Sequence, residues 1–144
     1  MVGDGELRDQ VEEMIHNFDM DSSFLITGWV DKPTAYMKIM DVGMLLSRWE
    51  GFGLVLPEYM ACGVPIIATN VDAIPNIVKD GVNGMLINKD SFVGAQKVCT
   101  RLNSDTELKD RIIVSAKSMV KNKFGAKIVA KESIELYKNL EKQN

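Results

Sequence analysis

Two glutamates flank a glycine-containing turn near the middle of the chain, and their spacing suits joint chemistry. Glu50 and Glu58 have seven residues between them, and that stretch leads from an apolar run into a predicted helix. Glycines in the turn permit backbone conformations that other residues avoid, so a ligand can approach the main chain closely. The free amides at the start of the helix would point at the same turn and form an anion site. A carboxylate on each side of such a site suits a nucleotide-sugar.

The two carboxylates cannot have the same role. Glu58 lies in the first turn of the predicted helix, where it can accept hydrogen bonds from the vicinal hydroxyls of a ribose. Glu50 would repel a diphosphate if it lay against it, so we expect it to face the transferred sugar. There it would contact sugar hydroxyls or positive charge developing at the anomeric carbon. The alternative is a pair of solvated carboxylates near a helix start, where the helix dipole favours them.

The elements that position this pair follow an alternating pattern of helix and strand. A short apolar strand at 41–46 precedes the turn, and a helix at 54–62 follows it, ended by Gly63-Val64-Pro65. Further strands are expected at 24–27, 65–69 and 85–87, with helices at 7–18, from 34, near 75 and over most of 92–140. Alternation of this kind predicts an α/β fold with a parallel sheet between helices.

Composition agrees with one soluble domain: the chain has 144 residues, of which 46% are hydrophobic and 26% charged. The two cysteines, Cys62 and Cys99, lack zinc-like spacing and are expected to be buried free thiols in a cytoplasmic protein. Residues 111–131 carry six cations and no carboxylate in a chain of net charge −3. We favour a solvated helix face there over contact with an anionic membrane or a lipid diphosphate. The overall acidity argues against nucleic-acid binding.

Several segments together resemble the donor-binding half of family-4 (group 1) retaining glycosyltransferases of the GT-B fold. They are Ser47, the Glu-Gly-Phe-Gly-Leu core at 50–54, the run Met-Ala-Cys-Gly-Val-Pro-Ile-Ile-Ala-Thr at 60–69, and Gly-Val-Asn-Gly at 81–84. The resemblance implies transfer of a sugar from a nucleotide diphosphate-sugar with retention of configuration, without a metal or other cofactor. It also implies a donor held between two Rossmann-like domains. The whole of 1–144 is similar to most of the second domain, with C-terminal helices from about 91, and the acceptor domain is absent.

The resemblance assigns roles to particular residues. Glu50 matches the family's catalytic-site glutamate, and Glu58 matches its ribose-binding glutamate. Backbone amides around the turn would contact the sugar and the diphosphate, and a second segment near the N-terminus would contact the base. The donor-binding residues implied in this way are Gly3, Trp29, Val30, Phe52, Gly53, Leu54, Val55 and Glu58. For Trp29, packing against a strand end is an equally good interpretation.

Two departures from the family pattern limit what can be carried over. At 69–76 the chain has Asp72-Ala73 where the family more often has two glycines, and Asn76 where it has an acid. We therefore assign no donor contact to that loop. The chain also opens near the family's second strand, without the first strand and without the arginine and lysine that usually neutralise the diphosphate. A sheet that lacks a central strand exposes an edge, so we expect association or strand swapping between copies.

The function expected from these observations is that of a retaining glycosyltransferase domain. Its donor would be a UDP-hexose or UDP-N-acetylhexosamine, and its acceptor a lipid-linked or cell-surface polysaccharide such as lipopolysaccharide or O-antigen, bound through the missing domain. We expect the 144 residues alone to be inactive. Alternatives that stay open are a soluble glucan- or sucrose-type synthase, a nucleotide-sugar epimerase, and a non-catalytic nucleotide-sugar-binding module.

Overall fold

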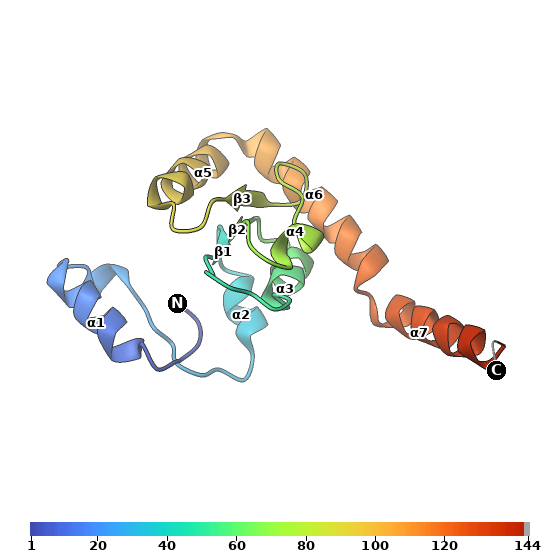
Figure 1. Cartoon of the computed structure of the whole chain (residues 1–144). Helices are drawn as coiled ribbons and strands as arrows, with labels where there is room; N and C mark the ends of the chain where they lie inside the picture. Colours follow the sequence, from blue (N-terminus) through green and yellow to red (C-terminus); the bar gives the residue numbers. More distant parts are fainter. Residues whose placement is uncertain (143–144) are drawn as a thin grey trace. The chain divides into compact units, whose positions relative to one another are not determined.

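The computed structural model describes residues 1–142 and divides the chain into two compact units, Met1–Tyr36 and Met37–Asn144. Figure 1 shows the course of the chain. The elements are α1 (Arg8–Asn17), a 3₁₀ turn η1 (Asp21–Ser23), α2 (Pro33–Met37), β1 (Gly43–Leu45), α3 (Val55–Cys62), β2 (Ile66–Thr69), α4 (Ile74–Ile77), β3 (Met85–Ile87), α5 (Phe92–Ser104), α6 (Thr106–Lys123) and α7 (Ala126–Glu141). The expected α/β alternation is confirmed, and most expected elements agree with these bounds to within two or three residues.

The second unit contains a three-stranded parallel sheet in the order β1-β2-β3. In the register of the sheet, Gly43 of β1 pairs with Ile66 of β2, and Ile67 of β2 pairs with Met85 of β3. Strand β2 is buried along its whole length because it lies in the middle of the sheet. Strands β1 and β3 each pair with β2 alone among the described residues, so both form edges of this sheet.

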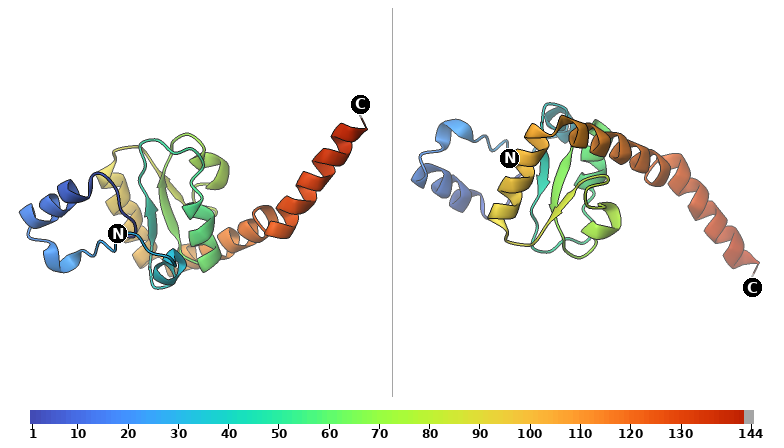
Figure 2. Two further views of the ribbon diagram at one scale, coloured as in Figure 1. Left: turned by 90° about the horizontal axis from the view of Figure 1, so that it is seen from below. Right: turned by 90° about the horizontal axis from the view of Figure 1, so that it is seen from above.

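Helices cover both faces of this sheet, as Figure 2 shows from two sides. One face packs against α3 and α4 through a core that includes Leu56, Met60, Ile66 and Ile74. The other packs against α5, and α6 contributes to both cores, through Ala116 on the first and Ile112 on the second. The fold is therefore a Rossmann-like α/β arrangement with helices on each side of a parallel sheet.

The first unit has less regular structure than we predicted. The expected strand at 24–27 is wrong: this segment is extended, but the structure records only an isolated bridge between Gly3 and Gly28. The Gly3 amide donates to the Gly28 carbonyl over 3.1 Å, and the Thr27 amide donates to the Met1 carbonyl over the same distance. The recorded bonds do not form a continuous ladder. Among the described residues, this unit buries no hydrophobic side chain.

The two cysteines also differ from expectation. Both are free thiols, but Cys62 at the end of α3 and Cys99 in α5 are half-buried rather than buried. Cys99 packs at the border of the second core rather than inside it. Among residues 1–142, no helix combines the length and the apolar character that crossing a bilayer requires.

Candidate functional site

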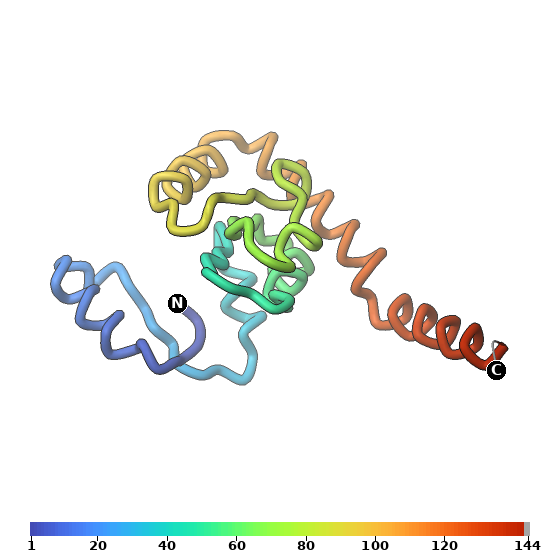
Figure 3. The backbone as a smooth tube through the Cα atoms, in the orientation of Figure 1, coloured from blue at the N-terminus to red at the C-terminus, as the bar shows by residue number. Residues whose placement is uncertain are grey.

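The turn between β1 and α3 carries the predicted site residues of the second unit, and Figure 3 allows its path to be followed. Gly53 is buried and has a φ of 78°, the left-handed region that favours glycine. A Cβ at this position would come within 3.2 Å of the Leu56 Cδ1 atom and 3.4 Å of the Glu50 Cγ atom. The backbone angle therefore favours glycine, and a Cβ would also be tight against Leu56.

Helix α3 begins without a capping side chain. Leu54 occupies the N-cap position, and no side chain accepts a hydrogen bond from the first turn. In the described part of the chain, the backbone amides of Phe52, Gly53, Leu54 and Val55 donate no hydrogen bond. These amides form a row of available donors at the positive end of a helix dipole. Such a row is suited to binding an anion.

Glu50 is half-buried and is held at both its side chain and its backbone. Ser47 Oγ donates to Glu50 Oε2 over 3.3 Å, and the Glu50 amide donates to Asp72 Oδ2 over 2.9 Å. Thr69, at the end of β2, completes the network by donating from Oγ1 to the Ser47 carbonyl over 2.6 Å. The carboxyl ends of β1 and β2 are thus joined through the loop that carries Glu50.

Asp72 is the residue of this network that the sequence analysis did not assign. It has a φ of 45°, so it adopts the left-handed conformation that a glycine would adopt easily. Aspartate is among the few other residues that tolerate this region. The sequence could have indicated this contact, because Asp72 has a side chain that accepts hydrogen bonds at a position where the family more often has a glycine.

Glu58 lies in the first turn of α3, and Phe52 lies in the loop before this helix. Glu58 is exposed. Burial and, to a smaller extent, the negative charge of Glu58 raise the pKa of the adjacent Tyr59. The Phe52 ring packs edge-on against Phe124 at the end of α6, with 6.2 Å between centroids and 80° between planes. This contact restrains the Phe52 side chain, which stays partly exposed.

Three other predicted residues gather in the first unit. Gly3, Trp29 and Val30 line one hollow of about 370 Å³, together with Val2, Asp31 and Pro33. The Trp29 side chain is 85% exposed, so it does not pack against a strand end. A large aromatic face beside a hollow is suited to stacking against a planar base. Contact with the base stays a prediction, as do the other assigned roles.

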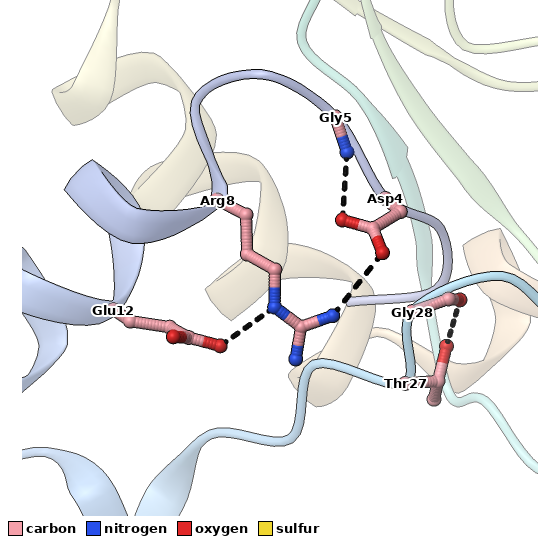
Figure 4. Close-up of polar contacts among 6 residues, drawn as sticks. All are labelled: Asp4, Gly5, Arg8, Glu12, Thr27 and Gly28. Atoms are coloured by element: carbon pink, nitrogen blue, oxygen red, sulfur yellow. Dashed lines mark hydrogen bonds and ion pairs between the residues drawn. The ribbon is translucent and has the colours of Figure 1, made fainter.

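Arg8, the arginine of the first unit, is already paired, as Figure 4 shows. Arg8 Nε donates to Glu12 Oε1 over 2.8 Å, and its Nη1 donates to Asp4 Oδ2 over 3.3 Å. The hydrogen bond and charge of Glu12, followed by those of Asp4, raise the pKa of Arg8. In the second unit, Arg48 is likewise paired with Asp90 over 2.9 Å. Either arginine would have to give up a carboxylate partner in order to bind a diphosphate.

Comparison with known proteins identifies the family. The family model described as "Glycosyl transferases group 1" matches residues 1–104. The chain belongs to the group 1 glycosyltransferases. It is 31% identical over 137 residues to N-acetyl-alpha-D-glucosaminyl L-malate synthase of Bacillus anthracis, which covers 95% of this chain and 36% of that protein. It is 26% identical over 145 residues to the Staphylococcus aureus capsular polysaccharide biosynthesis glycosyltransferase CapM, covering 100% of this chain and 38% of the relative.

Solved structures show the same fold. The Anabaena protein Alr3699/HepE in complex with UDP-glucose superposes with a TM-score of 0.89 at 22% identity, over 96% of this chain and 40% of that one. The chain matches GT-B glycosyltransferase structures, so the expected fold class is confirmed. The chain spans less than half the length of each of these proteins.

Proposed function

We propose that this chain forms the nucleotide-sugar-binding part of a retaining glycosyltransferase. The observation that carries the proposal is the row of four available amides at Phe52, Gly53, Leu54 and Val55, between the carboxylates of Glu50 and Glu58. A diphosphate at these amides would receive several hydrogen bonds and the favourable end of a helix dipole. In this arrangement Glu58 would be near the ribose of a nucleotide-sugar, and Glu50 would be near its transferred sugar.

The proposed chemistry divides between the two glutamates. Glu58, exposed on the first turn of α3, accepts hydrogen bonds from the ribose hydroxyls. Glu50, held by Ser47 and Asp72, accepts hydrogen bonds from the donor sugar and stabilises positive charge that develops at its anomeric carbon. In this proposal no metal takes part, and backbone amides donate hydrogen bonds to the diphosphate.

The donor is proposed to be a UDP-hexose or UDP-N-acetylhexosamine. The structural neighbour Alr3699/HepE was solved with UDP and with UDP-glucose, which supports a uridine nucleotide here. Gly3, Trp29 and Val30 line the hollow that would receive the base. The family's relatives in capsule synthesis support a lipid-linked or cell-surface polysaccharide as the acceptor. We place transfer at the cytoplasmic face of a membrane, with the acceptor bound by chain outside these 144 residues.

The proposal is tested by an NMR titration with UDP and, separately, with GDP. Binding should shift the amide resonances of Leu54, Val55 and Glu58 at the anion site, and that of Val30 at the base site. Shifts at both sites with UDP and weak or no shifts with GDP are the expected result. If neither nucleotide moves the α3 amides, the anion-site assignment is wrong. If both move all four amides equally, the choice of uridine is wrong.

A further inference from the structure

Asp72 lies in the loop between β2 and α4, yet its side chain holds the loop that follows β1. Its Oδ2 atom accepts the Glu50 backbone amide over 2.9 Å, and the two residues are 22 positions apart. Its Oδ1 atom makes no hydrogen bond within residues 1–142, and the side chain is exposed to solvent. One carboxylate oxygen is therefore committed to Glu50, and the other is available at the sugar end of the proposed site.

The backbone of Asp72 is held in an unfavourable region to make this contact. Its φ of 45° is one that non-glycine residues adopt rarely, though aspartate and asparagine do so more readily than others. A glycine would adopt the same angle with less strain, but it could not accept the Glu50 amide. The side chain thus supplies a contact that the backbone alone would not.

Asp72 and Glu50 are in contact, so two negative charges lie at the sugar end of the proposed site. The cation on the same loop, Arg48, is already engaged with Asp90 over 2.9 Å. An anionic sugar arriving here would meet two carboxylates and an arginine that already has an acidic partner. A neutral sugar would meet acceptors for its hydroxyl groups.

We propose that Asp72 is a positioning and specificity-determining residue for the donor sugar. It fixes the backbone of Glu50, and its negative charge selects nucleotide-sugars with uncharged hexoses over those with uronic acids. This inference rests on the proposed function, and it names the class of donor that the same site accepts. Asp72 does not take part in bond making or breaking.

The test measures equilibrium affinities of the complete polypeptide for UDP, UDP-glucose and UDP-glucuronic acid by titration calorimetry. UDP alone reports on the base and diphosphate sites, and the ratio between the two sugar nucleotides reports on charge at the sugar end. For the unaltered protein we expect UDP-glucose to bind about 10-fold more tightly than UDP-glucuronic acid. Failure of UDP itself to bind would overturn the proposed function and this inference together.

Two substitutions separate the two roles of Asp72. Asp72→Asn keeps an acceptor oxygen and tolerates the left-handed backbone but removes the charge, so preference for UDP-glucose should fall to about 2-fold or 3-fold. Asp72→Gly removes the acceptor, so affinity for UDP-glucose should fall about 5-fold while affinity for UDP is unchanged. An unchanged preference in Asp72→Asn, or an unchanged affinity for UDP-glucose in Asp72→Gly, would overturn the inference although UDP binds.

Asp19 provides a matched control. It is also an exposed aspartate with a left-handed backbone, with a φ of 54°, but it lies in the first unit and contacts no predicted site residue. Asp19→Asn and Asp19→Gly should leave all three affinities unchanged. If they alter the ratio between the sugar nucleotides as the Asp72 variants do, the effect is not specific to the Glu50 loop and the inference fails. If Asp72→Gly does not fold, Asp72→Asn still decides the charge effect.

Discussion

Glu50 is the residue on which the proposed transfer depends most directly. Its carboxylate receives a hydrogen bond from Ser47, and its backbone is fixed by Asp72, so its position does not depend on a bound ligand. Glu50→Gln keeps the size of the side chain and removes the charge that would stabilise the anomeric centre. We expect kcat for transfer by the complete enzyme to fall about 100-fold, with UDP affinity and thermal stability nearly unchanged.

The matched control for this substitution is Glu107→Gln. Glu107 is an exposed carboxylate in the first turn of α6, away from the β1–α3 turn, and its substitution should leave kcat unchanged. Transfer at the normal rate by Glu50→Gln would remove Glu50 from the mechanism. A large loss of thermal stability would mean that its role is structural.

Thr69 is a buried polar residue whose hydroxyl connects two strand ends. It is 2% exposed and donates to the Ser47 carbonyl over 2.6 Å. Thr69→Val has nearly the same shape but leaves that carbonyl without its donor, so the free energy of unfolding should fall by about 1–3 kcal/mol. Urea denaturation measures this change. Thr69→Ser retains the hydroxyl and should lower the free energy of unfolding less. A loss in Thr69→Ser with none in Thr69→Val would show that the methyl group matters and the hydrogen bond does not.

Among the elements, β1 and α3 fit together because a glycine faces an aromatic ring. A Cβ built on Gly43 would come within 2.8 Å of the Tyr59 ring, a distance that packed atoms do not tolerate. Gly43→Ala should therefore lower the free energy of unfolding by about 1–3 kcal/mol through overpacking. The measurement is again urea denaturation of the single variant.

Two further variants check that the cause is this contact. Gly51→Ala introduces the same methyl group where the nearest atom, on Trp49, is 3.8 Å away, and it should change stability little. In a Tyr59→Ala background, Gly43→Ala should lower the free energy of unfolding much less, because the ring that the new methyl group would meet is absent. An equal cost with and without the ring would assign the effect to the backbone of β1.

At the scale of the whole molecule, stability is concentrated around β2. All four residues of β2 are buried, whereas α1 and α7 bury none of their described residues. Helices without a packed face are marginal in water, because most helix stability in proteins comes from tertiary contacts. Amide hydrogen exchange followed by mass spectrometry should therefore show rapid exchange in α1 and α7 and slow exchange in β2.

An outcome with α7 as strongly protected as β2 would contradict this expectation. It would mean that α7 is covered in solution by another copy or by another part of the polypeptide. Repeating the exchange at several protein concentrations separates these explanations, because protection by a second copy increases with concentration. The same series tests the expected association of copies through the open edge of the sheet beside β1.

The sequence by itself determined the class of fold and most element bounds, and it predicted the pair Glu50 and Glu58. These features follow from local information: apolar runs of strand length, helical periodicity, and glycines that end or interrupt regular structure. The left-handed cap at Gly63, with a φ of 76°, ends α3 where the sequence predicted. The motif around Glu50 also carried the family resemblance that the comparisons confirmed.

Only the tertiary structure decided which residues hold Glu50 in place. The contacts from Asp72 to Glu50 and from Thr69 to Ser47 each join residues 22 positions apart, across the ends of neighbouring strands. Such contacts depend on how strands pair and how loops close, and no local pattern encodes them. The expected strand at 24–27 was wrong for a related reason: its composition suits a strand, but a strand also needs ladder hydrogen bonds to a neighbour, and the structure records only an isolated bridge beside this segment.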